Sequence, residues 1–508
     1  MHPSALLLAL CAGPAAPAAA AGGEIVASLN RGNDEAGDGS AAAPYRTVTK
    51  ALAAARAAGA ALVRLEYGTY EQGEAYPLAL PAGIELRGIG AGGSVLRGGA
   101  DVLVRLEPGD GETVLAGLSL SGAGAATGIG LDLAPEAGLP VSALLRGVTL
   151  EGLGTGVRAR TGEAALRLTG TGLRAVDCGT GIDAEGTGEL ALELADAAFE
   201  RCRVGLLLRA AEGAELTTYD GPPARHALAL RRTAFVDCSE AGLARRGAAG
   251  TNEGPPYLLE DCLFQGNETG IDLQRPAADT PIRVLSSRFL WNRGFGLRAS
   301  GQEGNPAAVS TVEACEFRWN GVGLHVTNAH VVYEVRRAAF LDHTGNALFL
   351  SNFQTAPLKA RVESCLIAGN GGAGIYTMAD GERIAVEVLH CTVLDNGAAG
   401  VHRKTRHAGK STLELRGSIV AGNAPDLEKI EPAEVFRSLI GDGSAGAEQG
   451  NLSGAPLFVD PARRDYRLRA DSPCVDGGEP DPRLSALDVA GRPRAAGPPD
   501  LGACEREP

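Results

Sequence analysis

One pattern of apolar and polar positions recurs along the chain from about Val141 onward. In a typical unit, apolar Phe264 is followed three positions later by Asn267 and then by the pair Gly270-Ile271. Equivalent positions lie mostly 23 to 29 residues apart, and each unit also holds alternating apolar and polar runs that are typical of strands. The unit begins again at Phe289, Phe317, Phe340, Ile367, Val393 and Val420.

A repeat of this length is too short for two helices, and its apolar residues lack helical spacing. Three short strands joined by turns match one coil of a parallel β-helix, because a single coil buries its apolar face only when neighbouring coils stack on it. We therefore predict an all-β fold, a single-stranded right-handed parallel β-helix with an N-terminal capping helix. At about 4.8 Å per coil, roughly 13 or 14 coils would form a rod about 65 Å long.

Equivalent residues on successive coils are expected to form ladders. Asn267 and its equivalents suit a turn, where the amide can bond to the next coil. Earlier units carry Cys178, Cys202 and Cys238 at this position. A second set of cysteines lies five residues before the Asn and is predicted to point into the core as small apolar residues: Cys262, Cys315, Cys365 and Cys391.

The segment before the repeat has a different pattern. Val48, Leu52 and Ala55 keep helical spacing, and Gly59 can end the helix as a C-cap. Such a helix would cover the open end of the rod, where edge strands otherwise invite aggregation. The predicted organisation is a signal peptide at 1–21, a capping region with the first coils at 22–100, repeats at 101–430 and a C-terminal module at 431–508.

The N-terminal residues and the net charge indicate where the protein is located and which partners it can bind. The first 21 residues hold an apolar run and then small residues, as in a secretory signal peptide, so we expect a secreted or cell-surface protein. No later apolar stretch approaches the roughly 20 residues of a transmembrane helix. A net charge of −14 without a basic run argues against nucleic acid as a partner. We expect a monomer.

The N-terminal segment carries a first resemblance. Asn33-Asp34, Asp38-Gly39-Ser40, the run from Pro44 to Val48 and the run from Tyr67 to Tyr70 match a domain of unknown function found at the start of bacterial β-helix proteins. The resemblance covers about residues 25 to 100. Asp34 and Asp38 are weak candidates for binding Ca²⁺, although turn capping explains them equally well. We expect no cofactor, with Ca²⁺ as the alternative.

The C-terminal stretch from Asn451 to Ala503 carries a more specific resemblance. It is similar to the choice-of-anchor type module that ends bacterial surface β-helix proteins and that in relatives precedes varied anchoring segments. Cys474 and Cys504 are the only two cysteines in this module. Export permits a bridge between them, so we predict a disulfide.

The repeats as a whole resemble the pectate-lyase-like superfamily, which contains polysaccharide lyases, glycoside hydrolases, epimerases and non-catalytic adhesins. The fold does not decide among these functions. The sequence shows neither a paired-carboxylate signature nor a lyase-like Asp/Arg cluster, and it lacks familiar motifs of serine, zinc or nucleotide chemistry. Whether the protein is an enzyme therefore stays open.

One outward row is distinctive. The residue after each Gly-apolar pair should point out of the coil, because the apolar residue before it points in. Aromatic and imidazole side chains gather in this row on the later coils, where they suit stacking against sugar rings. The candidate binding residues are Arg298, His325, Phe349, Tyr376 and His402. Asp272 and His325 are candidates for a catalytic acid or base.

Three interpretations follow. The favoured hypothesis is a surface protein that binds extracellular polysaccharide along one face of the coils without turnover. The alternative is a polysaccharide lyase or glycoside hydrolase with its site between Asp272 and His402. An ordinary strand surface with scattered aromatics is the third.

Overall fold

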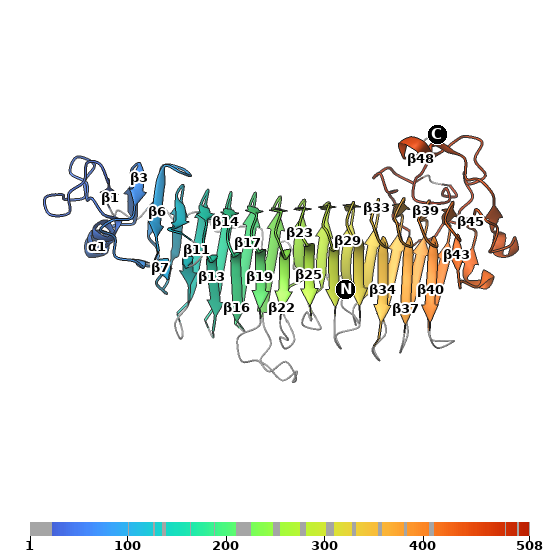
Figure 1. Cartoon of the computed structure of the whole chain (residues 1–508), viewed down its shortest axis with the longest axis horizontal. Coiled ribbons are helices and arrows are strands. Elements are labelled where there is room, and N and C mark those ends of the chain that lie inside the picture. Colours follow the sequence, from blue (N-terminus) through green and yellow to red (C-terminus); the bar gives the residue numbers. More distant parts are fainter. Residues whose placement is uncertain are drawn as a thin grey trace.

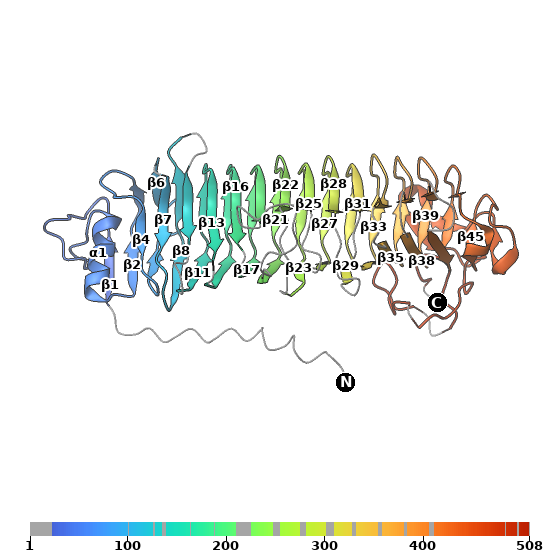
Figure 2. The same cartoon turned by 90° about the horizontal axis from the view of Figure 1, so that it is seen from below.

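A computed structural model describes residues 23–99, 101–124, 128–134, 139–162, 164–186, 188–209, 225–246, 255–274, 281–300, 309–327, 332–353, 358–379, 384–405, 411–482, 484–494 and 497–506. In these residues the chain forms one rod of stacked coils, with helix α1 (Val48–Ala58) at one end. The C-terminal residues return along one side of the last coils (Figure 1, Figure 2). The predicted signal peptide lies outside the described residues.

Three parallel sheets run the length of the rod. Sheet A consists of β1 (Glu24–Ala27), β2 (Leu62–Leu65), β5 (Glu85–Arg87), β8 (Glu112–Ala116), β11 (Val141–Arg146), β14 (Leu166–Thr171), β17 (Glu189–Ala195), β20 (Arg225–Arg231), β23 (Tyr257–Glu260), β26 (Ile282–Leu285), β29 (Val309–Glu313), β32 (Val332–Arg336), β35 (Leu358–Glu363), β38 (Ile384–Leu389), β41 (Thr412–Arg416) and β44 (Val435–Phe436).

Sheet B consists of β3 (Gly68–Tyr70), β6 (Ser94–Gly98), β9 (Ser119–Gly122), β12 (Thr149–Glu151), β15 (Arg174–Val176), β18 (Ala198–Glu200), β21 (Ala234–Val236), β24 (Leu263–Gln265), β27 (Arg288–Leu290), β30 (Glu316–Arg318), β33 (Ala339–Leu341), β36 (Leu366–Ala368), β39 (Thr392–Leu394), β42 (Ile419–Ala421), β45 (Leu439–Ile440) and β46 (Leu452–Ser453).

Sheet C consists of β4 (Leu78–Leu80), β7 (Val102–Leu106), β10 (Ile129–Leu133), β13 (Thr155–Thr161), β16 (Thr180–Gly186), β19 (Val204–Arg209), β22 (Ala241–Arg246), β25 (Thr269–Gln274), β28 (Phe295–Ser300), β31 (Val322–Thr327), β34 (Leu348–Asn352), β37 (Ile375–Ala379), β40 (Val401–Thr405) and β43 (Leu427–Glu428). Each coil passes from sheet A through sheet B to sheet C, so the predicted parallel β-helix is confirmed.

A column of phenylalanines fills the core behind sheet B. The middle residue of each short strand points inward, and on consecutive coils these rings stack in parallel with centroids 4.4 to 4.9 Å apart. Complete burial of each ring contributes about 2 to 3 kcal/mol, and the one-per-coil spacing fixes the register of neighbouring coils. The column is Phe199, Phe235, Phe264, Phe289, Phe317 and Phe340.

The predicted asparagine ladder follows directly after sheet B. Asn292 is fully buried, and its Oδ1 accepts from both the backbone N–H and the Nδ2 of Asn267, at 3.2 and 3.0 Å. Asn320 repeats the arrangement towards Asn292. Each amide thereby satisfies buried donors that would otherwise cost free energy. The predicted core cysteines, Cys262, Cys315, Cys365 and Cys391, are buried as well.

The N-terminal helix lies at the end of the rod as predicted. Thr47 Oγ1 caps it by accepting from the Lys50 N–H, and the Glu74 carboxylate accepts from the first two helical N–H groups. Gly59 ends the helix in the left-handed conformation, at φ 65°. The helix packs its buried face over β1, β2 and β4, which covers the end of the core.

The C-terminal residues cover the outer face of sheet B on the last coils. Their small antiparallel pair, β47 (Phe458–Asp460) and β48 (Asp465–Leu468), belongs to a second apolar cluster in which Tyr466 and Leu468 pack with Leu341, Leu394 and Ile419 of sheet B. Three 3-10 helices lie in this part, at Pro432–Glu434 (η1), Glu448–Gly450 (η2) and Pro461–Arg463 (η3). Sheet B is therefore apolar on both faces where this segment packs.

The predicted disulfide is not formed in the structure, where Cys474 and Cys504 are both free thiols. Cys474 packs into the second apolar cluster with Leu501. Cys504 lies near Asp488 and Arg494, and burial raises the pKa of its thiol to about 12. The two side chains thus have different surroundings.

No helix in the described part of the chain combines the length and the apolar character needed to cross a membrane.

Candidate functional site

The strand register brings the predicted binding residues into one row on the outer face of sheet C. Arg298 pairs with His325, His325 with Phe349, Phe349 with Tyr376, and Tyr376 with His402 on consecutive strands. We call these five residues the sheet C row. All five side chains are half-buried. Their equivalence in successive repeats of the sequence thus corresponds to physical adjacency in the structure.

Ring contacts link the four ring residues of the row, His325, Phe349, Tyr376 and His402. The His325 imidazole stacks on Phe349 with centroids 4.4 Å apart and planes 7° apart. Tyr376 meets Phe349 at 5.1 Å and His402 at 4.9 Å, the latter edge to face. Such contacts hold the rings in place and leave a continuous aromatic strip across four consecutive strands.

The imidazoles of the row are held neutral. Burial, and secondarily the Arg298 guanidinium, lowers the pKa of His325 to about 4. Its Nε2 lies 3.4 Å from Ser351 Oγ, and its Nδ1 is buried without a hydrogen-bond partner. His402 lies beside Glu428, with Nδ1 3.0 Å from Oε2, yet burial still lowers its pKa. At neutral pH the row therefore presents uncharged imidazole rings, whose nitrogens are buried or lie against protein partners.

Asp272, the other candidate acid or base, is held in an ion-pair cluster. Its side chain is only 4% exposed. Oδ2 lies 2.8 Å from both Arg246 Nη2 and Arg298 Nη2, and Gln274 donates to the same oxygen at 3.1 Å. The Arg298 contact is bidentate, with Nε donating to Oδ1 and Nη2 donating to Oδ2, both at 2.8 Å, which fixes the orientation of the two side chains. The cluster positions Arg298 at the start of the sheet C row, and an acid or base role for Asp272 stays a prediction.

The candidate calcium ligands have protein donors. Asp34 accepts from the backbone N–H groups of Arg46 and Thr47 and from Thr47 Oγ1, at 2.8 to 3.0 Å. Asp38 accepts from the Ser40 N–H at 2.9 Å. These are the contacts that turn capping predicts, and binding of Ca²⁺ by Asp34 and Asp38 stays a prediction. Among the residues that the structure describes, no group of three or more His, Cys, Asp or Glu side chains could hold a metal ion.

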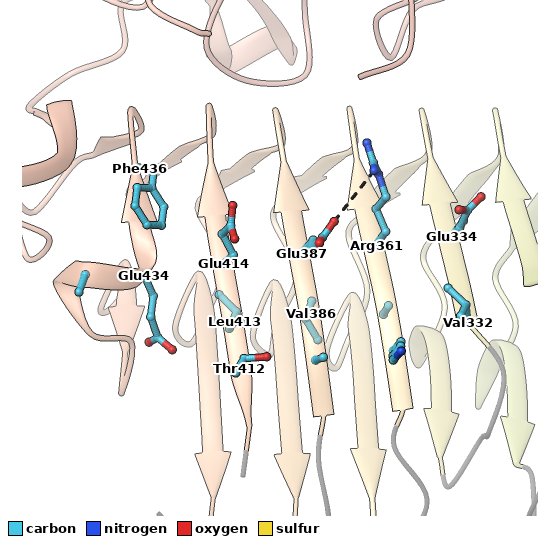
Figure 3. A pocket seen from close by; sticks show the side chains of 14 residues that line it. Val332, Glu334, Arg361, Val386, Glu387, Thr412, Leu413, Glu414, Glu434 and Phe436 are labelled. Carbon is cyan, nitrogen blue, oxygen red and sulfur yellow. Dashed lines mark ion pairs between the residues drawn. The ribbon is translucent and has the colours of Figure 1, made fainter. Parts of the chain in front are cut away.

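A groove that the sequence did not indicate lies over sheet A on the later coils. It encloses about 560 Å³ and is open along the rod. Its floor is an outward row on consecutive strands in which Glu334 pairs with Arg361, Arg361 with Glu387 and Glu387 with Glu414 (Figure 3). Phe436 of β44 lies at its far end.

Most groove carboxylates have arginine partners. Glu414 lies 3.0 Å from Arg416, and Glu334 lies 2.6 Å from Arg336. The Arg361 guanidinium approaches Glu387 at 4.0 Å (Figure 3). The groove is therefore a polar surface of mixed charge. In the sequence, the groove residues appear only as polar positions that alternate with apolar ones in the strands of sheet A. Every solvent-exposed strand shows the same alternation, so the sequence alone does not reveal the groove.

Comparison with known families agrees with the fold. Residues 247–414 match the family described as "Right handed beta helix region". This part of the chain is a right-handed β-helix. Residues 30–150 match the family described as "Protein of unknown function (DUF1565)", so the N-terminal resemblance extends beyond the predicted residue 100 into the coils.

Solved structures with similar coils differ in activity. The catalytic unit of the thermostable GH87 α-1,3-glucanase from Streptomyces thermodiastaticus strain HF3-3 is 15% identical over 78% of this chain and 69% of that chain, with a TM-score of 0.47. The Azotobacter vinelandii mannuronan C-5 epimerase AlgE4 A-module is 16% identical over 76% and 100%, with a TM-score of 0.42. Pectate lyase Pel9A is 13% identical over 95% and 96%, with a TM-score of 0.33. No curated protein matches the chain.

Proposed function

We propose that the protein binds extracellular polysaccharide along the sheet C row without turning it over. The observation that carries this proposal is the unbroken contact of His325, Phe349, Tyr376 and His402 on consecutive strands. Rings with an apolar body and a polar edge suit sugars, which combine apolar C–H faces with hydroxyl groups. One such side chain per coil suits a polymer that lies along the rod.

Charge supports a neutral glycan as the ligand. The chain carries a net charge of −14, and the one cation that belongs to the sheet C row, Arg298, is already paired with Asp272, whereas Lys404 and Lys429 lie near His402. An anionic polymer would meet an unfavourable field. Non-catalytic binding agrees with the state of the two candidate acid or base groups, since Asp272 is enclosed by arginines and His325 is neutral at physiological pH.

The test is a screen of neutral and uronate-containing glycans for binding and for depolymerisation. We expect binding of a neutral glycan without release of new reducing or unsaturated ends, and about tenfold weaker binding by Tyr376→Ala because one stacking platform is lost. Tyr67→Ala is the matched control, since Tyr67 is 66% exposed near the other end of the rod. Unchanged affinity of Tyr376→Ala contradicts the proposal, as does depolymerisation.

The groove over sheet A favours a second function, polysaccharide hydrolysis. Glu387 and Glu414 are paired residues on adjacent strands and both line the groove (Figure 3). Two carboxylates flanking a sugar linkage are the usual machinery of glycoside hydrolysis. If this function holds, Glu387→Gln and Glu414→Gln would each abolish depolymerisation. Glu193→Gln, on the same outward row far from the groove, would not change it.

A further inference from the structure

The C-terminal segment is held on the coils at the corner where sheet A passes into sheet B, close to β38 and β39 (Figure 2). Two backbone N–H groups of the segment donate to the coils here. Gly502 donates to the Gly417 carbonyl and Ala503 donates to Thr392 Oγ1, both at 2.8 Å. His390 lies between β38 and β39 and is only 2% exposed. This corner is therefore an interface between the segment and the rod.

His390 is an unusual residue for this corner. Its φ is 47°, in the left-handed region that residues with a bulky side chain rarely adopt. The equivalent corners of the preceding and the following coil carry the smaller residues Ser364 and Gly417. The His390 side chain instead reaches the C-terminal segment, where its Nδ1 lies 3.0 Å from the Asp500 carbonyl oxygen. A strained backbone position thus carries a side chain that binds the segment.

Two glycines enclose the imidazole. A Cβ atom at Gly417, on the next coil, would lie 2.5 Å from His390 Nε2. A Cβ atom at Gly478, in the C-terminal segment, would lie 2.7 Å from Cε1. Because both distances are shorter than a van der Waals contact, the ring fits only while these positions lack side chains. The imidazole is therefore packed between the coils and the segment.

The hydrogen bond to the segment fixes the protonation of the neutral ring. A carbonyl oxygen can only accept, so Nδ1 carries the hydrogen that it donates to Asp500. Nε2 is then the atom that takes up a second proton. Among the residues that the structure describes, no group forms a hydrogen bond with Nε2. A proton on Nε2 would place a positive charge in this interface without an acceptor, which costs free energy.

The surroundings of the ring oppose its protonation. Burial, and secondarily the Arg494 guanidinium of the segment, lowers the pKa of His390 to about 4. Arg416 of the coils acts in the same direction. The Asp500 carbonyl and Asp481, both in the segment, act against it and do not restore the ordinary pKa. The closed interface therefore holds a neutral imidazole.

Other carboxylates of the interface have partners of their own. Glu505 pairs with Arg494 at 3.1 Å, and Glu479 lies 3.6 Å from Arg416. The two carboxylate oxygens of Asp500 accept from backbone N–H groups of the segment itself, at 2.8 and 2.7 Å. These contacts stabilise the fold of the segment and its charges. They do not supply an ion pair for a protonated His390.

We propose that His390 is a pH-sensitive switch, which holds the C-terminal segment on the coils while the imidazole is neutral and releases it when the imidazole takes up a proton. In the released form the imidazole is in water, where it titrates near pH 6.5. The released form therefore binds more protons than the closed form between about pH 6.5 and about pH 4, so acidification through this range weakens the closed form. Release uncovers the apolar outer face of sheet B, where Leu341 and Leu394 lie. This inference does not depend on glycan binding.

Hydrogen exchange of the full chain tests the switch. Mass spectrometry follows a peptide of the segment that contains the Gly502 and Ala503 N–H groups, at about pH 7.5 and about pH 5, with the rates corrected for the intrinsic pH dependence of exchange. We expect the protection of this peptide to be about 30-fold lower at the acidic pH. This ratio follows from a pKa of about 4 in the closed form and about 6.5 in the released form.

Two histidine variants separate the switch from a general effect of acid. Asn tolerates the left-handed backbone, and its Nδ2 can donate to Asp500 in place of the imidazole Nδ1, so His390→Asn should keep the segment closed at both pH values, with a ratio below about twofold. His226→Gln is the matched control. His226 is also buried with a pKa of about 4, and its Nε2 lies 3.0 Å from the Gly186 carbonyl oxygen, but it belongs to β20 of the coils. This control should keep the fall of about 30-fold.

Each variant is compared with itself at the two pH values, so a variant that is simply less stable does not disturb the test. Equal protection of the unmodified chain at both pH values overturns the switch, as does an unchanged pH ratio in His390→Asn. An equal reduction of the ratio in both variants also overturns it, because the peptide would then exchange only when the whole rod unfolds.

Discussion

Buried histidines link single residues to the stability of the rod. Burial lowers the pKa of five histidines of the described chain, to about 3 for His343 and to about 4 for three others, and it lowers that of His402 as well. In the unfolded chain these groups take up protons near pH 6.5. The unfolded state therefore binds more protons than the native state at acidic pH. The five are His226, His325, His343, His390 and His402.

This difference predicts acid sensitivity. The free energy of unfolding should be highest above about pH 6.5 and fall as the pH decreases towards about 4, by roughly 3 kcal/mol for each fully buried histidine. Urea midpoints measured at about pH 7.5 and about pH 5 check this. Equal or higher stability at the lower pH would contradict the burial of these imidazoles.

His343 is the one imidazole within the asparagine ladder. Its Nδ1 accepts from the Asn320 N–H at 3.0 Å, but its Nε2 is buried without a partner, and the Asn320 amide loses the acceptor that an asparagine would supply. His343→Asn should restore the ladder and raise the free energy of unfolding by about 1 kcal/mol. It should also reduce the acid sensitivity. Chemical denaturation at two pH values measures both effects, and a loss of stability at neutral pH would show that the imidazole is needed for packing.

At the scale of elements, local patterns predicted much of the structure. The helical spacing of Val48, Leu52 and Ala55 indicated α1, and the repeat placed Asn267 in a ladder and Phe349 beside Tyr376. These features depend on periodicity and on the stacking of equivalent residues. A single amino-acid sequence is therefore sufficient to predict these features.

Contacts made by the C-terminal segment, which folds back over sheet B, could not be predicted from the sequence. The apolar residues on the outer face of sheet B, such as Leu394, look like ordinary strand residues until the C-terminal segment packs on them. The groove over sheet A depends on the charged outward rows of several coils.

The packing of the C-terminal segment on sheet B can be tested by a single substitution. Leu394→Asp places a charge in the apolar contact with this segment, where Leu394 is 3% exposed, and should release the segment at a cost of a few kcal/mol. Leu290→Asp is the matched control, because Leu290 has the same place in a strand of sheet B that the apolar cluster does not include. Limited proteolysis should cut the first variant within the C-terminal residues and leave the control resistant. Equal resistance of both variants would contradict the docking.

At the scale of the whole molecule, the rod turns a one-dimensional repeat into a linear surface. Equivalent residues recur at about 4.8 Å, so a row of side chains can follow a polymer over several units without any deep pocket. A polymer bound to this surface would contact several coils at once.

The dependence of affinity on oligosaccharide length tests the proposed binding most directly. The sheet C row from Arg298 to His402 spans five strands, or about 20 Å. Calorimetric titration with neutral oligosaccharides of increasing length should show affinity that rises with each added sugar and levels off near four units, with no new reducing ends. Affinity that is independent of length, or products of cleavage, would contradict binding along the row.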